Sequence, residues 1–178
     1  MSGHNKWSKI KRQKAGTDAA KSKIFSKMAR AIATASRQVN GDVTSPILRT
    51  AIEKAREFNM PSDNIERAVK KGSGADAEAM ESITYEAYGP GGCALVIEAL
   101  TTNRNKAAQE VKFILSENGF ALAGQGSATW AFKRELTTNN WQPTTTVPLS
   151  EDDSKLLEKL IEELEDNDEV QEVYTNAE

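Results

Sequence analysis

Residues 82–100 read SITYEAYGPGGCALVIEAL, and this stretch decides the fold of the chain. Ser82–Tyr88 alternates apolar and polar side chains, which predicts a half-buried β-strand. Cys93–Leu100 is almost continuously apolar, as expected for a strand that is buried on both faces. The Gly89-Pro90-Gly91-Gly92 segment between them favours a turn. The whole stretch therefore predicts a hairpin within an antiparallel sheet.

Further helix and strand patterns follow this hairpin. Asn103 is placed to cap a helix that runs to about Asn118, and Ser150 with Asp153 forms a capping box for a later, leucine-rich helix. The side chains expected to face inward from that later helix are Leu156, Leu157, Leu160, Ile161 and Leu164. Strands are predicted at 127–134, 144–149 and 170–174, the first with Ala128, Trp130 and Phe132 on one face. This order predicts one antiparallel sheet backed by helices.

Before the hairpin, the apolar residues recur at the spacing of helices instead of strands. A first helix is predicted from about Thr17, as its N-cap, to Arg37. Ser45 followed by Pro46 predicts the start of a second helix, and Asn59-Met60-Pro61 predicts its end. The capping-box pair Asp63 and Glu66 opens a third helix, which Gly72 can end.

The predicted fold class is therefore α+β, with an N-terminal three-helix domain followed by an antiparallel-sheet α/β sandwich domain. The expected domains are a flexible basic tail over residues 1–16, the three helices over 17–75 and the sandwich over 80–178. The tail holds two sizeable apolar side chains, Trp7 and Ile10, so it cannot bury enough surface to fold alone.

Charge is divided sharply along the chain. Residues 1–71 carry 16 Lys and Arg against 6 Asp and Glu, whereas residues 72–178 carry 7 against 20. The net charge of −3 therefore hides a basic first part (+10) and an acidic second part (−13). A basic segment of this kind points to a nucleic-acid partner.

Residue types that support catalysis are scarce. The single histidine, His4, lies in the tail, and the single cysteine, Cys93, lies in an apolar strand where an inert core thiol is expected. The glycines at 89–92 lack the Lys-Ser/Thr of a phosphate-binding loop. The acidic runs at 151–153 and 162–169 are interpreted as a solvated helix face. We expect no enzyme activity, no catalytic residue, no metal site and no cofactor.

Membrane and export signals are also missing from the sequence pattern. No apolar run approaches the roughly 18 residues that span a bilayer, and the basic N-terminus lacks the apolar stretch of a signal peptide. A cytoplasmic location with no membrane partner is therefore expected. The oligomeric state does not follow from the sequence.

The candidate nucleic-acid-binding residues begin in the tail. Cations two to four residues apart can follow a phosphate backbone, and Trp7 among them could stack on an unpaired base. The alternative is a solubilising tail whose Trp7 packs on its own domain. The tail candidates are Lys6, Trp7, Lys9, Lys11, Arg12 and Lys14. The candidates on the helices are Lys21, Lys23, Lys27, Arg30 and Arg37 on the first, and Lys70 and Lys71 at the end of the third. Four of these, Lys23, Lys27, Arg30 and Arg37, form a stripe on the first helix.

Several motifs, in order, resemble those of the YebC/PmpR family. They are Gly3-His4-Asn5-Lys6-Trp7 through Lys14, Asn59-Met60-Pro61 with Asp63 to Ala68, Tyr85-Glu86 with Tyr88 to Gly92, Asn103-Arg104-Asn105-Lys106, Gly126 to Trp130 with Phe132, and Val170-Gln171 with Val173 to Asn176. Arg104 and Lys106 of the fourth motif complete the candidate binding residues. Asn5 and Cys93 depart from the family pattern, which has Ser and an aliphatic residue there. A further α/β segment of the family is missing near residues 135–143.

The resemblance implies a cleft-shaped, three-domain fold that is reduced here to two domains. It also implies a role as a ribosome-associated translation factor that binds RNA of the large ribosomal subunit and helps translation of difficult sequences such as proline runs. The alternative role within the family is a DNA-binding transcriptional regulator. The residues themselves leave RNA and duplex DNA both open as partners.

Overall fold

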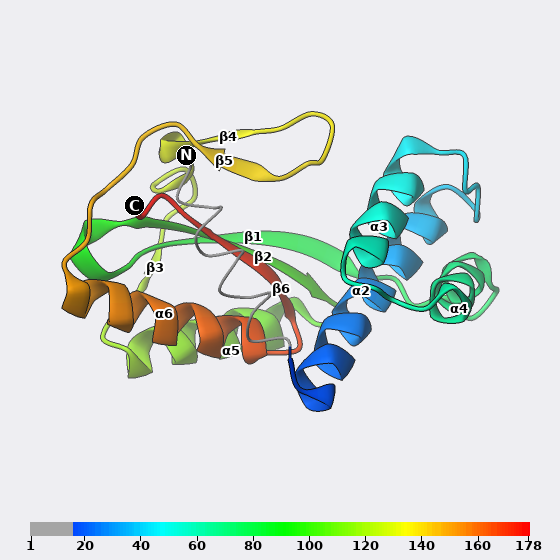
Figure 1. Cartoon of the computed structure of the whole chain (residues 1–178), viewed down its shortest axis with the longest axis horizontal. Coiled ribbons are helices and arrows are strands. Elements are labelled where there is room, and N and C mark those ends of the chain that lie inside the picture. Colours follow the sequence, from blue (N-terminus) through cyan, green and yellow to red (C-terminus); the bar gives the residue numbers. More distant parts are fainter. Residues whose placement is uncertain (1–15) are drawn as a thin grey trace. The chain divides into compact units, whose positions relative to one another are not determined.

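The chain folds into two compact units. The computed structural model describes residues 16–178. The helical unit comprises the described residues up to Met80, and the sheet unit comprises residues 81–178 (Figure 1). Three helices precede an antiparallel sheet with helices of its own, so the predicted fold class is confirmed.

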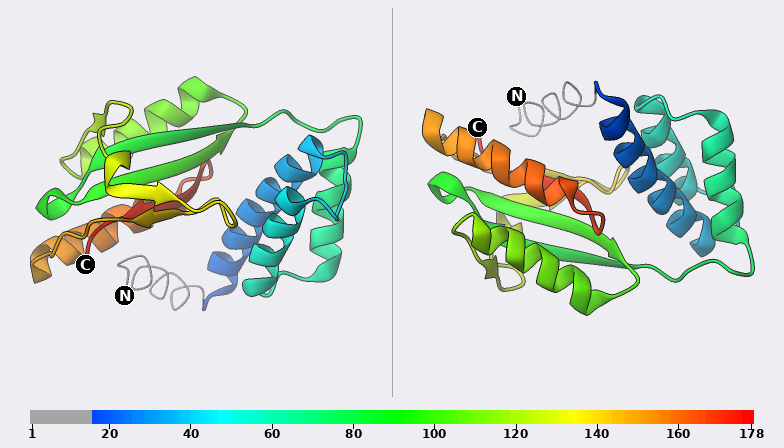
Figure 2. Two further views of the ribbon diagram at one scale, coloured as in Figure 1. Left: turned by 90° about the horizontal axis from the view of Figure 1, so that it is seen from above. Right: turned by 90° about the horizontal axis from the view of Figure 1, so that it is seen from below.

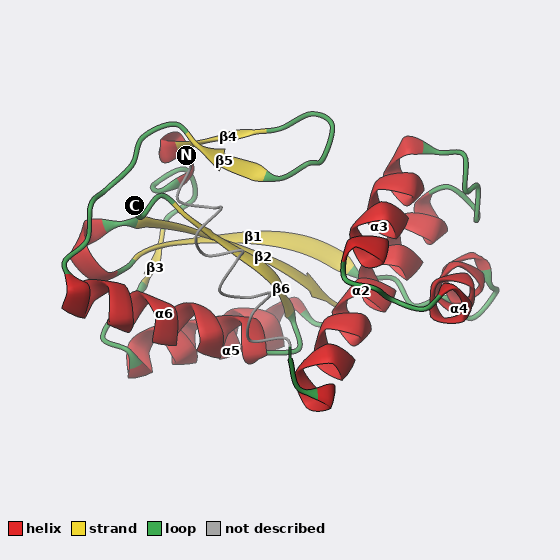
Figure 3. Cartoon of the chain, viewed as in Figure 1, coloured by secondary structure: helices red, strands yellow, loops and turns green. Residues whose placement is uncertain are grey.

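The helical unit consists of α2 (Asp18–Gln38), α3 (Pro46–Glu57) and α4 (Ser62–Ser73) (Figure 3). Apolar side chains at helical spacing meet in a single core. The buried members of this core are Ile32, Ala35, Leu48, Ile52, Ala55, Met60, Ile65 and Ala68. Only the apolar faces of the helices enter this core, so most of the cations stay at the surface.

The helix starts in this unit agree only in part with the sequence prediction. Thr17 caps α2, since its Oγ1 accepts the N–H of Ala20 at 3.2 Å. Ser45 precedes α3 as predicted but makes no side-chain capping bond. The capping box at Asp63 is wrong, because the N-cap of α4 is Pro61, two residues earlier, and Asp63 lies inside the first turn. Its carboxylate still interacts favourably with the positive, N-terminal end of the helix dipole.

Gly72 has a different role from the predicted one. It lies inside α4, which continues to Ser73, and it is buried against α2. A Cβ at this position would lie 2.2 Å from the carbonyl oxygen of Ala33. Gly72 therefore allows α2 and α4 to approach closely, and beside it the hydroxyl of Ser36 donates to the carbonyl of Val69 at 2.7 Å.

The sheet unit is built on four antiparallel strands in the order β3-β1-β2-β6. These are β1 (Glu81–Tyr88), β2 (Ala94–Thr101), β3 (Leu122–Ala123) and β6 (Val170–Thr175). The predicted hairpin is β1 and β2, joined through a short 3-10 turn (Pro90–Gly92), and Tyr85 pairs with Ile97 within it. β2 lies between β1 and β6 and is buried on both faces, with Leu95 and Ile97 in one core and Ala94 and Val96 in another, which explains its continuous apolar sequence.

One face of the sheet is covered by α5 (Arg104–Glu117) and α6 (Glu151–Asp166) (Figure 2). Both helices begin at the predicted caps, because Asn103 Oδ1 accepts the N–H of Lys106 at 3.1 Å and Ser150 Oγ accepts that of Asp153 at 3.1 Å. Leu157, Leu160 and Leu164 are fully buried, as predicted. Leu156 is 51% exposed instead of facing inward.

The opposite face carries a second, two-stranded hairpin, made of β4 (Phe132–Arg134) and β5 (Trp141–Pro143). The prediction of strands at 127–134 and 144–149 is wrong here. Residues 129–131 form a 3-10 turn, and the strand begins only at Phe132. The second predicted strand is reduced to a bridge between Val147 and Ala177. Trp130 consequently lies at the surface instead of sharing a buried face with Ala128 and Phe132.

Candidate nucleic-acid interface

The predicted binding residues lie partly in the tail and partly on helices of both units. Those of the tail lie outside the described residues, as does His4. The tail set comprises Lys6, Trp7, Lys9, Lys11, Arg12 and Lys14. The remaining candidates lie on α2, α4 and α5, and their surroundings differ from one helix to the next.

The predicted cation stripe on α2 is not uniformly exposed. Lys23, Lys27 and Arg30 are half-buried, and none of them lacks an interaction partner. Arg37 is exposed, and its guanidinium donates a hydrogen bond to the carbonyl of Ala77. The stripe as a surface for phosphates stays a prediction.

A groove of about 660 Å³ runs between α2 and α4. Three exposed cations line it, namely Lys21 from α2 with Arg67 and Lys71 from α4. Apolar atoms line it as well, most prominently the half-buried ring of Phe25. The full lining is Asp18, Lys21, Ser22, Phe25, Ser26, Ala29, Met60, Asn64, Arg67, Ala68 and Lys71.

Helical periodicity explains why these side chains gather in one place. Lys21 and Phe25 are four residues apart on α2, and Arg67 and Lys71 are four apart on α4, so each pair lies on one helix face. Asn64 Oδ1 accepts a hydrogen bond from Arg67 Nη2 at 3.0 Å, which restrains the guanidinium within the lining of the groove. The three cations outweigh the charge of Asp18, so the groove has a net charge of +2. Such a site suits a nucleic-acid strand, because the cations can contact its phosphates and the ring of Phe25 lies beside them.

Arg67 and Phe25 are absent from the residues predicted from sequence. A signal for Arg67 existed, because its spacing from Lys71 places both cations on one side of a helix. That spacing does not say which side meets α2. The close approach at Gly72 decides this, and it is a property of the packed helices.

The two candidates on α5 are paired with carboxylates. Arg104 Nη2 lies 3.3 Å from Glu81 Oε1. Lys106 Nζ lies 3.3 Å from Glu169 Oε1 and 3.8 Å from Glu110 Oε1. The hydrogen bond and charge of Glu169, with the charge of Glu110, raise the pKa of Lys106. These cations are therefore partly neutralised within an acidic neighbourhood.

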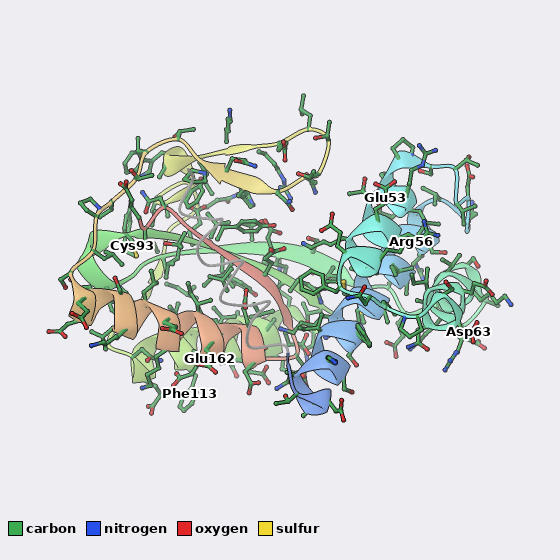
Figure 4. The ribbon with its side chains drawn as sticks, viewed as in Figure 1. Glu53, Arg56, Asp63, Cys93, Phe113 and Glu162 are labelled. Carbon is green, nitrogen blue, oxygen red and sulfur yellow. The ribbon has the colours of Figure 1, made fainter. Side chains whose placement is uncertain are left out.

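Groups suited to catalysis are sparse in the described residues. Cys93, immediately before β2 (Figure 4), is fully buried in the core of the sheet unit, and burial raises the pKa of its thiol, which opposes thiolate formation. Within residues 16–178, no group of three or more His, Cys, Asp or Glu side chains is arranged to hold a metal ion. Over the same range, none of the helices combines the length and apolarity that crossing a bilayer requires.

Two motifs of the sheet unit, one around Glu86 and one over residues 126–130, are joined by hydrogen bonds to a buried carboxylate. Glu86 is 4% exposed, and its two oxygens accept the N–H groups of Gly126, Ala128 and Thr129 at 2.7, 2.7 and 2.8 Å. Burial alone would raise the pKa of this carboxyl, but the three N–H groups hold the pKa below its ordinary value. Next to it, Trp130 Nε1 donates to Tyr88 Oη at 2.9 Å.

Comparison with known proteins gives a consistent set of similarities. The family model of the TACO1/YebC protein N-terminal domain matches residues 5–75. The model of the TACO1/YebC second and third domain matches residues 80–139 and 135–177. A crystal structure of a conserved hypothetical protein from Aquifex aeolicus is 29% identical, with a TM-score of 0.77, and the match covers 90% of this chain and 91% of that one.

Curated relatives share one name, probable transcriptional regulatory protein. The relative from Fervidobacterium nodosum is 40% identical over 235 aligned positions, which cover 99% of this chain and 93% of the relative. The relative from Rubrobacter xylanophilus is 36% identical over 237 positions, which cover 99% and 95%. The relative from Pseudothermotoga lettingae is 52% identical over 138 positions, which cover 76% of this chain and 54% of the relative.

Proposed function

The chain belongs to the TACO1/YebC family, and from this premise we propose that it is a regulatory protein that binds nucleic acid through the groove between α2 and α4. The observation that carries the proposal is the meeting of Lys21, Arg67 and Lys71 around an apolar groove in the basic part of the chain. Cations from two helices can contact successive phosphates, and Phe25 adds a ring beside them.

The tail cations precede the helical unit in the sequence, and their part in binding remains a prediction. Ten Lys and Arg lie in residues 1–37 against a single acidic residue, Asp18. Replacing Lys9, Lys11, Arg12 and Lys14 with Ala should weaken binding and flatten its salt dependence by about 0.7–0.9 per lost phosphate contact. An unchanged affinity would exclude the tail as a binding element.

For the partner, we propose RNA of the large ribosomal subunit, in the role of a translation factor that helps difficult sequences such as proline runs. Support comes from the form of the groove, in which cations flank a partly accessible aromatic ring, because such rings stack on unpaired bases. The second candidate is a transcriptional regulator on duplex DNA. The shared name of the curated relatives favours it.

We also propose that this chain is a shortened member of the family. The two matches to the model of the second and third domain meet at residues 135–139, which form the tip of the β4–β5 hairpin. The alignment with the Fervidobacterium relative extends over 235 positions, whereas this chain has 178 residues. Contacts that the additional segment makes in longer relatives would therefore be absent here.

Paired variants test the groove. Replacing Arg67 and Lys71 with Ala should weaken binding to single-stranded RNA and reduce the slope of log affinity against log salt by about 0.7 per lost contact. The control replaces Arg49 and Arg56, two exposed cations of α3 outside the groove, and removes the same charge (Figure 4). Equal losses in both variants would mean that net charge alone acts, and the groove would be rejected.

A separate measurement distinguishes the partners. Wild-type protein that co-sediments with large ribosomal subunits, and loses this with the Arg67 and Lys71 variant, would support the translation role. A footprint on a specific duplex sequence without co-sedimentation would replace it with the transcriptional role.

A further inference from the structure

Trp130 is held at the surface of the sheet unit in one orientation. Its side chain is 63% exposed, although a large aromatic ring would gain free energy from burial. The indole N–H donates to Tyr88 Oη at 2.9 Å, and the hydroxyl of Tyr88 in turn donates to the carbonyl of Ser127. The polar edge of the ring is therefore satisfied while much of its apolar surface stays open.

The backbone beneath Trp130 is fixed by the buried carboxylate of Glu86. Three N–H groups from residues 126–129 point at this carboxylate. Hydrogen bonds to a buried charge are strong, and a buried charge that loses its hydrogen-bond donors costs free energy. The loop therefore has little freedom to move. A ring presented on a fixed loop loses little conformational entropy when a ligand stacks on it.

We propose that Trp130, supported by Tyr88, is a stacking platform for an unpaired nucleobase. The proposal rests on the proposed nucleic-acid-binding function and adds a second contact, on the sheet unit, to the groove on the helical unit. Stacking on an indole requires no particular base, since every base has an aromatic face, so this contact would add affinity without sequence preference.

The charge around the platform fits a nucleic-acid strand. The acidic helix α6, with eight Asp and Glu against two Lys, lies on the opposite face of the sheet (Figure 2). On the side of Trp130, the β4 strand supplies the exposed cation Lys133, whereas the neighbouring Arg134 is paired with a carboxylate, its Nη2 lying 3.8 Å from Glu98 Oε1. A phosphate next to a stacked base would therefore have Lys133 on its side of the sheet and would avoid the carboxylates of α6.

A protein partner is less consistent with this surface. Hot-spot tryptophans in protein interfaces are usually centred in a larger apolar patch. Here Ser127 and Thr129 of the loop are polar, and its apolar members Ala128 and Ala131 are fully buried. Tyr88, the one large aromatic neighbour that contacts Trp130 by a hydrogen bond, is 38% exposed. An isolated flat ring with a polar rim is better suited to a base.

The test uses the full chain and an unstructured RNA oligonucleotide. Trp130→Ala should weaken binding by about five- to a hundredfold, whereas Trp130→Phe, which keeps a stacking ring, should retain most of the affinity. The salt dependence should be unchanged, because losing a stacked base releases no counterions. Phe113→Ala is the matched control, since Phe113 on α5 is also 63% exposed but points away from the sheet on the acidic side (Figure 4).

A fluorescence measurement keeps the test valid if Trp130→Ala is unstable. In a variant with Trp7→Phe and Trp141→Phe, Trp130 is the sole source of indole emission, and stacking of a base should quench it. Unchanged emission on binding, or an affinity of Trp130→Ala equal to wild type, would overturn the proposal. If the Arg67 and Lys71 variant still weakens binding in that case, the proposed function stands. If wild type binds no RNA, both proposals fail.

Discussion

The two units of this protein hold their surfaces in place by opposite means. In the helical unit, a missing side chain at Gly72 brings α2 against α4, and the groove cations gather beside that contact. In the sheet unit, a buried charge at Glu86 organises the loop that carries Trp130. Close packing of two helices positions the groove, and hydrogen bonds to a buried carboxylate position the loop of Trp130. The two surfaces should therefore be sensitive to different substitutions.

The units also differ in charge. Residues 16–80 carry 11 Lys and Arg against 8 Asp and Glu, whereas residues 81–178 carry 7 against 18. Acidic side chains such as Glu162 occupy the outer face of α6, opposite its buried leucines (Figure 4). A phosphate backbone is therefore attracted to the helical unit and repelled from α6, which would orient the protein on its partner.

The largest expected effect is the removal of the buried carboxylate. Glu86→Ala leaves three N–H groups without an acceptor and should lower the free energy of unfolding by about 3–5 kcal/mol. Glu98→Ala is the control, because Glu98 accepts from the side chains of Thr84 and Trp141 and pairs with Arg134 instead of holding backbone N–H groups; we expect a smaller loss of about 1–2 kcal/mol. Urea denaturation measures both. Equal losses would mean that polar satisfaction of the loop is not what stabilises this unit.

The corresponding test in the helical unit concerns Gly72. Gly72→Ala places a Cβ against the Ala33 carbonyl and should destabilise the unit by about 1–3 kcal/mol, despite the higher helix propensity of Ala. The control is Gly74→Ala, where the nearest atom would lie at 3.4 Å and the change should stay within about 0.5 kcal/mol. Thermal unfolding followed by circular dichroism compares them. A neutral Gly72→Ala variant would contradict steric fit as the basis of the α2–α4 contact.

Helix caps should affect both units alike, because they act locally. Thr17→Ala in α2 and Ser150→Ala in α6 each remove a hydrogen bond to a helix N–H and should cost about 1 kcal/mol. Ser45 precedes α3 without such a bond, so Ser45→Ala should cost clearly less. A larger loss at Ser45 than at Thr17, measured by urea denaturation, would show that hydroxyl capping does not explain these helix starts.

The smallest expected effect is the loss of stability when the pH is lowered and Glu86 is protonated. Because the folded state holds the pKa of Glu86 below its ordinary value of 4.5, the stability that this group contributes is complete above that value. It is lost as the pH falls through the folded-state pKa. The emission of Trp130 in the single-tryptophan variant should therefore change only below pH 4.5, and Glu86→Gln should abolish the transition. A transition that persists in Glu86→Gln would have to arise from another carboxyl.

Much of the fold follows from local patterns. The hairpin at 82–100, the caps at Thr17, Asn103 and Ser150, and the helix end before Pro61 are all governed by nearest neighbours along the chain, and the structure places them as predicted. The errors lie where a distant group intervenes. Residues 127–131 read as a strand, but Glu86, about 40 residues away, binds their N–H groups and draws them into a loop.

The candidate site divides in the same way. The sequence by itself determined the helices, the hairpin and the basic first part of the chain, because propensity, capping and charge are local properties. Only the tertiary structure decided that Lys21 meets Arg67 and Lys71, because their faces meet through contacts between helices that are far apart in sequence. It also decided that Trp130 is exposed, since that depends on the hydrogen bonds of Glu86 and Tyr88, which no periodicity encodes.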